Sequence, residues 1–197
     1  TGVQTCALPI YKKAIENYGK QTPEEAYYVE NSLGILYMKL GNFAKAEQIF
    51  HKLLKVFKNS HPLYNAVLQN IAAAYIETNQ LPKAKQIQIQ IIENQKTVLG
   101  EHHADYGLAL NNLGVIFQKE TSYQEAAKYF RLALNISMEN YGTESLDYAL
   151  KETNLGAVEK DLNNLERARQ TLEHAQKILL QKLGKIGRAH VWTPVTL

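Results

Sequence analysis

One pattern of residues returns four times along this chain, and its spacing constrains the fold more than any other feature of the sequence. Each copy begins with an aliphatic residue followed by glycine or alanine. The aliphatic residues are spaced by 38, 42 and 42 positions: Leu33, Ile71, Leu113 and Leu155. Twelve positions after the small residue, every copy has an alanine: Ala46, Ala84, Ala126 and Ala168. This period predicts units that stack on their neighbours, because one unit of about 40 residues cannot bury its apolar face alone.

Within each copy, apolar residues return every three or four positions in two runs that are separated by a short polar turn. This spacing is typical of two amphipathic helices that form an antiparallel pair. Pro23, Pro62 and Pro82 mark three helix starts, because the first turn of a helix does not use its N–H groups. The predicted pairs are 23–40 with 43–59, 61–78 with 81–99, 103–119 with 123–140, and 144–161 with 165–184, after a half-pair at 11–20.

Small residues explain how the two helices of a pair can approach each other closely. Where Gly114 crosses near Ala126, the lack of bulk lets the helices touch, while Phe117 and Phe130 fill the space beside the contact. A larger side chain there would overpack the pair. We therefore expect an all-α, right-handed solenoid of antiparallel helix pairs. A coiled coil is excluded because no heptad seam continues through the polar breaks.

The order of small residue, aromatic residue, alanine and second aromatic residue at these spacings resembles the tetratricopeptide repeat. The long period and the segments HPLYNAVLQNIA (61–72) and GEHHADYGLALNNLG (100–114) are similar to its kinesin-light-chain-like subclass. The resemblance covers residues 11–185 in four repeats, at about 22–59, 60–101, 102–142 and 143–185. Gln88 and Glu159 depart from the pattern, which has a large apolar and an aromatic residue there, and we expect weaker packing at both.

The first ten and the last twelve residues lack this periodicity. Residues 1–10 (TGVQTCALPI) and 186–197 (IGRAHVWTPVTL) resemble the translation of a short-read sequencing adapter, one strand in front and its complement behind. Under this interpretation Trp192 implies that UGA is decoded as tryptophan. We therefore expect both segments to lie outside the fold, the domain to occupy residues 11–185, and both natural termini to be missing. The alternative is a pair of natural disordered tails.

The sequence contains no recognisable catalytic or cofactor site. It has no glycine-rich phosphate loop, no spaced cysteine set and no helical His-Glu-x-x-His motif, and its single cysteine, Cys6, lies in an adapter-like segment. His102 and His103 stand where similar repeats begin their first helix, and adjacent side chains on a helix diverge. We therefore expect these histidines to be structural, and we expect no metal, no cofactor and no enzymatic activity.

Charge and hydropathy argue against two further classes of partner. The chain has 22 Lys and Arg residues against 19 Asp and Glu, a net charge of +3, which is too small to recruit nucleic acid or an anionic membrane by electrostatics alone. No apolar run is long enough to span a bilayer. Four lysines form a stripe on one helix that lacks interleaved aromatic residues, and this predicts a solvated face: Lys45, Lys52, Lys55 and Lys58. No small-molecule substrate is indicated.

The remaining candidate site is the surface that the first helices present to the concave groove of such a solenoid. Asparagine recurs at one position of this surface, with serine in the first copy: Asn70, Asn112, Asn154 and Ser32. We call these four residues the ladder. Asn111 lies beside the ladder, and Leu108, Val115 and Leu150 would supply apolar contacts. An amide offers both donors and an acceptor to a peptide backbone. Alternatively, these asparagines only tie one repeat to the next, and the two roles can coexist.

These observations predict a non-catalytic scaffold that binds a peptide segment of a partner protein in its concave groove. One alternative is a regulatory or sensor module of a larger signalling protein, whose groove is filled by another part of its own chain. A second alternative is an accessory repeat region of an enzyme whose catalytic domain lies outside this sequence. The resemblance favours an intracellular protein, and the sequence alone identifies no partner.

Overall fold

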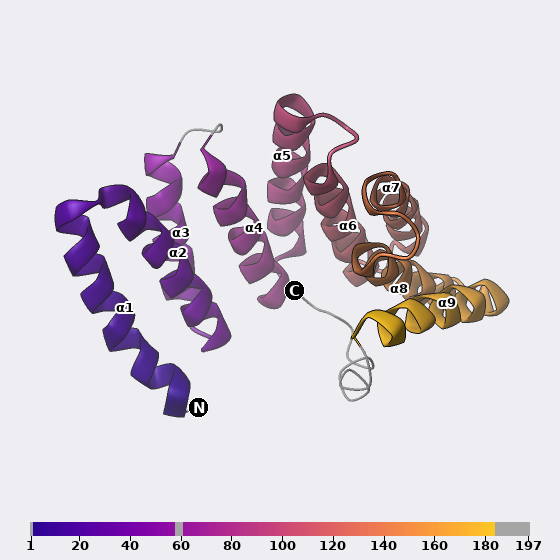
Figure 1. Ribbon diagram of the computed structural model, residues 1–197, viewed down its shortest axis with the longest axis horizontal. Helices are drawn as coiled ribbons and strands as arrows, with labels where there is room; N and C mark the ends of the chain where they lie inside the picture. The colour runs from indigo at the N-terminus through magenta and orange to yellow at the C-terminus, as the bar shows by residue number, and fades with distance from the viewer. Residues whose placement is uncertain (1, 58–60, 184–197) are drawn as a thin grey trace. The chain divides into compact units, whose positions relative to one another are not determined.

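The computed structural model describes residues 2–57 and 61–183, and all regular structure within these ranges is α-helical (Figure 1). The nine helices of this part of the chain are α1 (Gly2–Gln21), α2 (Pro23–Lys39), α3 (Phe43–Val56), α4 (Pro62–Glu77), α5 (Leu81–Leu99), α6 (Ala104–Lys119), α7 (Tyr123–Tyr141), α8 (Leu146–Asp161) and α9 (Leu165–Leu183). The all-α fold class predicted from the repeat is confirmed. The predicted bounds of the four helix pairs agree with the observed ones to within three residues.

The chain forms two compact units, which we call unit 1 (Thr1–Ile87) and unit 2 (Gln88–Leu197). In unit 1, α2 packs on α1 and α3, α3 packs on α4, and α2 also touches α4. In unit 2, α7 packs on α6 and α8, α8 packs on α9, and α6 also touches α8. Within each unit, the first helix of one pair therefore contacts both its own partner and the first helix of the next pair.

The beginning of α1 extends into the adapter-like segment. We expected residues 1–10 to be poorly supported by the rest of the fold, with at most incidental helix, and α1 runs without interruption from Gly2 to Gln21 and includes Pro9. Once a turn of helix exists, each further residue adds one hydrogen bond, so a helix can extend beyond the segment whose pattern predicts it. Ala7 and Leu8 are also half-buried. The adapter origin of residues 1–10 stays a prediction, and residues 186–197 lie outside the described ranges.

The turn inside each helix pair is built around one residue with left-handed backbone geometry. These residues have φ between 56° and 73° and stand at equivalent places in the four copies: Gly41, Asn79, Thr121 and Asn163. Glycine adopts this geometry at no steric cost, and asparagine tolerates it better than most residues do. In each copy, a left-handed residue at this place ends the first helix and returns the chain toward the second.

The close contact between paired helices that the small residues predicted is present. A Cβ atom added to Gly114 would lie 2.7 Å from Cε1 of Phe130, and one added to Gly156 would lie 2.7 Å from Cγ of Leu172. Phe130 is fully buried, and Phe117 stacks on Tyr129 with 5.3 Å between ring centroids. Phe130 and Leu172 therefore occupy the space that a side chain on Gly114 or Gly156 would need.

Gln88, one of the two departures from the apolar pattern, is accommodated by a hydrogen bond. The side chain is fully buried, and its amide nitrogen donates to the carbonyl oxygen of Ala109 on α6 over 3.0 Å. A buried amide with a partner avoids most of the cost of losing water. The weaker packing that we expected at this position is therefore offset by a polar contact between α5 and α6.

The Gly114 contact gives a direct test of the packing. We expect Gly114→Ala to lower the free energy of unfolding by about 1–3 kcal/mol, because Phe130 must move out of a filled space. Gly19→Ala is the matched control: Gly19 is also helical, but a Cβ there would meet no atom within 4 Å. Urea unfolding followed by circular dichroism should show a loss for Gly114→Ala only. Equal effects of the two substitutions would contradict the packing argument.

Candidate functional site

The predicted groove residues lie on the first helices of the four pairs, as the repeat implied. In unit 1, Ser32 lies on α2 and Asn70 on α4. In unit 2, the remaining residues lie on α6 and α8: Leu108, Asn111, Asn112, Val115, Leu150 and Asn154. Each unit therefore contains one wall made of two adjacent first helices, α2 with α4 and α6 with α8. A single groove that runs over both units stays a prediction.

Two of the ladder asparagines join neighbouring first helices through amide-to-amide hydrogen bonds. The Asn70 amide nitrogen donates to Oδ1 of Asn31 over 2.9 Å, and that of Asn154 donates to Oδ1 of Asn111 over 3.0 Å. We call these two contacts the amide clasps. They occupy the same repeat positions in both units, so the structure contains the repeat-to-repeat tie that the sequence had left as one of two roles.

Asn111 and Asn31 are the receiving side of the clasps. Asn111 is buried, which removes it from the surface that a ligand could touch and makes it part of the contact between α6 and α8. Asn31 was not among the predicted site residues. The signal that could have identified it is its position: it directly precedes Ser32, as Asn111 directly precedes Asn112.

Asn112 differs from the other members of the ladder. Its side-chain oxygen is buried and has no hydrogen-bond partner among the residues that the structure describes. An unpaired buried acceptor lowers stability by about 1–3 kcal/mol relative to a satisfied one. The side-chain oxygen of Asn112 therefore forms no tie between the described helices.

The apolar contacts of the predicted site are unequally exposed. Leu150 on α8 is 41% exposed, whereas Leu108 and Val115 are half-buried, and Val115 packs against the core that contains Phe130 and Val158. Tyr28 on α2 is 51% exposed and occupies the repeat position of Leu108 and Leu150. The first and fourth pairs thus each expose a large apolar side chain at one place on the first helix.

Ser32 bonds within its own helix, whereas the polar end of the unit 2 wall is held by a contact between two first helices. The Ser32 hydroxyl donates to the carbonyl oxygen of Tyr28 over 3.0 Å, a bond within α2. At the turn end of unit 2, the Gln118 amide nitrogen donates to Oδ2 of Asp161 over 3.0 Å. This hydrogen bond is a second contact between α6 and α8. The wall of unit 2 is therefore fixed at two points along these helices.

Glu159, the second departure from the pattern, is a buried acid with two partners. It is 3% exposed, it forms an ion pair with Arg131 of α7, and it accepts from the Asn164 amide nitrogen over 2.6 Å. Burial alone would raise the pKa of this carboxyl, but the hydrogen bonds from Asn164 and Arg131 and the charges of Arg131 and Arg167 outweigh it and hold the pKa below its ordinary value. Its contacts therefore connect α8 to α7 and to the start of α9.

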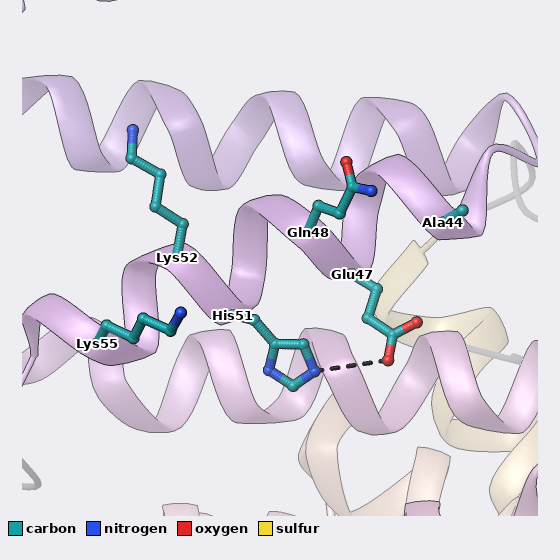
Figure 2. A pocket seen from close by; sticks show the side chains of 6 residues that line it. All are labelled: Ala44, Glu47, Gln48, His51, Lys52 and Lys55. Atoms are coloured by element: carbon teal, nitrogen blue, oxygen red, sulfur yellow. Dashed lines mark ion pairs between the residues drawn. The ribbon is translucent and has the colours of Figure 1, made fainter.

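A shallow hollow of about 470 Å³ lies along α3 and contains part of the lysine stripe (Figure 2). Glu47 in this hollow pairs with His51 at 3.5 Å and accepts from the Tyr75 hydroxyl over 2.7 Å. Burial, with the hydrogen bond to Glu47, raises the pKa of Tyr75 to about 12. Figure 2 shows Lys52 extending away from the Glu47–His51 pair. Its ammonium group neutralises the buried carboxylate of Glu30.

Of the adjacent histidines, His103 caps the start of α6 and His102 bonds to α7. Nδ1 of His103 accepts from the backbone N–H of Asp105 over 3.2 Å, as Nδ1 of His61 accepts from that of Leu63 over 3.1 Å. His102 instead pairs with Glu139 at 2.9 Å, and the hydrogen bond and charge of Glu139 raise the pKa of the imidazole.

Within residues 2–57 and 61–183, no three histidine, cysteine or acidic side chains group as metal ligands would. No helix in these ranges has the length and apolar character of a membrane span.

Comparison with known proteins identifies the repeat. The family model described as tetratricopeptide repeat matches residues 24–97, 64–139 and 105–181. The chain belongs to the tetratricopeptide repeat family. Tetratricopeptide repeats are generally scaffolds for protein–protein interaction and are typically not enzymes.

The relatives of this tetratricopeptide repeat chain include kinesin-light-chain-like proteins, which confirms the resemblance stated above. It is 26% identical over 182 residues to Protein KINESIN LIGHT CHAIN-RELATED 1 of Arabidopsis thaliana, covering 88% of this chain and 28% of that protein. It is 23% identical over 164 residues to the mitochondrial Tetratricopeptide repeat protein 19 homolog of Drosophila melanogaster, covering 81% of this chain and 41% of that protein. The chain thus spans less than half the length of these curated relatives.

A solved structure supports the tetratricopeptide repeat fold independently. The crystal structure of BtubC (BKLC) from P. vanneervenii superposes with a TM-score of 0.79 at 21% sequence identity, covering 93% of this chain and 76% of that one. At this identity the likeness establishes the fold alone.

The amide clasps can be tested by stability. We expect Asn154→Ala to lower the free energy of unfolding by about 1–3 kcal/mol, because Oδ1 of Asn111 would stay buried without its donor. Asn70→Ala should cost about 0.5–1.5 kcal/mol, since Asn31 is only half-buried. Asn112→Ala is the comparison variant and should cost less than Asn154→Ala, because its carbonyl has no partner in the described part of the repeat. If all three variants unfolded like the wild type in denaturant titrations, the clasps would not be structural ties.

Glu159 predicts a specific acid dependence. Because its pKa is lower in the folded chain than its ordinary value, its contribution is complete at neutral pH and is lost as the pH falls through the folded pKa. We expect wild-type thermal stability to fall more steeply than that of Glu159→Gln below about pH 4.3, the ordinary glutamate value. Melting curves at a series of pH values measure this difference. Parallel acid curves for the two proteins would exclude a stabilising role for the carboxylate.

Proposed function

We propose that this chain is a non-catalytic scaffold that binds a peptide segment of a partner protein along the concave side of its first helices. The support is that tetratricopeptide repeats generally mediate protein–protein interaction. It is also supported by the repetition of equivalent polar and apolar positions along α2, α4, α6 and α8. A ligand that follows these positions would meet an asparagine at three of the four repeats and a serine at the first.

The observation that carries the proposal is the exposure of large apolar side chains beside the clasps. Leu150 lies one helical turn before Asn154, and Tyr28 stands at the matching place, one turn before Ser32. Both side chains are more exposed than their neighbours on the wall, and they stand at one repeat position on the predicted groove surface. We propose that they contact apolar side chains of the bound peptide.

The clasps leave hydrogen-bonding capacity for such a peptide. Each amide side chain has two N–H groups and a carbonyl oxygen, and a clasp uses one N–H of its donating asparagine. The second N–H and the oxygen of Asn70 and of Asn154 suit the N–H and C=O groups of a peptide backbone. A tie between repeats and a contact to the ligand are therefore compatible in one residue.

The alternative of a module within a larger signalling protein or enzyme stays open in this proposal. It has one specific support, namely that the curated relatives extend well beyond the part that this chain matches. Such a role would use the same wall with a segment of the longer protein as its ligand. We expect no nucleic acid, membrane or small-molecule ligand in either case.

A displayed peptide library selected on the intact chain, followed by calorimetric titration, tests the proposed site. We expect Leu150→Ala to weaken the selected peptides by about tenfold or more, since it removes three buried carbons from the contact. Leu132→Ala is the matched control: Leu132 is equally exposed, at 42%, but lies on the second helix α7. Loss of affinity in Leu132→Ala and not in Leu150→Ala would move the site away from the first helices. A library that yields no binder would contradict the proposed function itself.

A further inference from the structure

One face of α6 carries an acid at its start, a base at its end and predicted groove residues between them. At steps of three and four residues this face presents Asp105, Leu108, Asn112, Val115 and Lys119, which we call the α6 stripe. Residues with this spacing are neighbours on one side of a helix. The groove surface of α6 is therefore bounded by two opposite charges.

The same order of chemistry occurs on α2 in unit 1. The equivalent residues there are Glu25, Tyr28, Ser32, Ile35 and Lys39, and the two charged side chains are exposed. The equivalent face of α4 begins with the buried Leu63 and ends with Glu77, so it has no acid at its start and no base at its end. In unit 1 the order from acid to base is thus confined to one of the two first helices.

In unit 2, the equivalent face of α8 has an acid at each end, and both carboxylates are already bonded. Asp147 accepts from Nζ of Lys151 over 2.6 Å and from the Ser137 hydroxyl over 2.6 Å. Asp161 accepts from the amide nitrogen of Gln118 over 3.0 Å. The order from acid to base is therefore found on α6 alone in the unit 2 wall.

The two charges of the α6 stripe have bonding capacity left for another molecule. Lys119 is exposed and forms no ion pair with an acid in the part of the chain that the structure describes. The Asp105 carboxylate is 58% exposed and lies 3.8 Å from Nδ1 of His103. That nitrogen already accepts the backbone N–H of Asp105, and an accepting ring nitrogen has no proton to donate to the carboxylate.

We infer that the unit 2 wall binds an extended segment with a basic side chain on one edge and an acidic side chain on the other. This inference rests on the proposed function. A peptide that crosses α6 at Asn112 lies about 10 Å from each charged residue, because seven residues of helix, at 1.5 Å each, separate them. Successive side chains of an extended peptide point to opposite sides. A basic side chain on one side then reaches Asp105, and an acidic one on the other reaches Lys119.

The apolar residues of the wall suit the carbon stems of these side chains. A ligand lysine or arginine that points toward Asp105 passes over Leu108 and the exposed Leu150 of α8. Long basic side chains pack their stems on apolar surface while the charged group stays in water. On the other side the four-carbon stem of Lys119 itself extends toward the acidic side chain of the ligand.

An acid near the start of a helix and a base near its end also stabilise the helix itself through its dipole. That contribution is present without a ligand and affects folding stability only. The helix dipole is indifferent to where a peptide carries its charges. Affinity for peptides that differ only in the position of their charges therefore separates binding from stability.

Two displayed peptide libraries of identical composition, selected on the intact chain, test the inference. Every peptide has one lysine and one glutamate, placed at an odd separation in one library and at an even separation in the other. We expect the odd-separation peptides to bind about threefold to tenfold more tightly in calorimetric titrations, because only they present the two charges on opposite edges. Asp105→Lys should shift the preference to peptides with two acidic residues, and Lys119→Glu to peptides with two basic residues.

The control variant is Lys177→Glu, which reverses an exposed charge on the second helix α9 and should leave the preference unchanged. Should Asp105→Lys fold poorly, Asp105→Asn removes the charge at similar size, and the requirement for a basic residue should disappear. Equal affinity for both libraries, with no shift in either α6 variant, would overturn this inference and leave the proposed function in place. Failure of every library, including one without fixed charges, would contradict the proposed function itself.

Discussion

The close contact between the two helices of each pair is the constraint on which the rest of the structure depends. Gly34, Gly114 and Gly156 have no room for a Cβ, because an aromatic or leucine side chain of the second helix fills that space. This contact fixes how far apart the helices of a pair lie, and hence where the next first helix can pack. The amide clasps are bonds of 2.9 and 3.0 Å between different repeats, so they form only when that spacing is met in both.

Most of the fold could be predicted because its determinants are local or periodic. Apolar spacing, helix-start prolines and polar turns act within a few residues, and the 42-residue period carries the same information to each copy. The first turns of α1 could not be predicted in this way, since a helix that has already formed extends through Pro9 without an amphipathic pattern. The wall of first helices followed from the repeat as well. The hydrogen bonds between its asparagines could not be predicted. The side-chain rotamer decides which of two neighbouring amides reaches the next first helix.

The polar residues that interrupt the apolar pattern have hydrogen-bond partners that the sequence alone does not indicate. Gln88, Glu159 and Glu152 each stand where the repeat has, in other copies, a large apolar or aromatic residue, and each is satisfied by a group on a different helix. Their partners lie 21 to 28 residues away and are the side chains of Arg131 and His174 and the backbone carbonyl of the buried Ala109. The repeat pattern therefore indicates two of these three departures, Gln88 and Glu159, but not the groups that compensate them. The glutamate at 152 was missed altogether, because its position is not one of the small, alanine and aromatic positions that define the repeat.

The left-handed turn residues also determine where a chain of this kind can change in length. Each follows the repeated aliphatic residue by eight positions in all four copies, so the distance from the first helix to the turn does not vary. The shorter period between the first and second copies arises elsewhere: α3 has 14 residues, whereas α5, α7 and α9 have 19 each. Insertions and deletions between related chains are therefore compatible with the fold at the far end of a second helix, which emerges from the stack. Within the hairpin itself, one added residue would rotate every later side chain out of register.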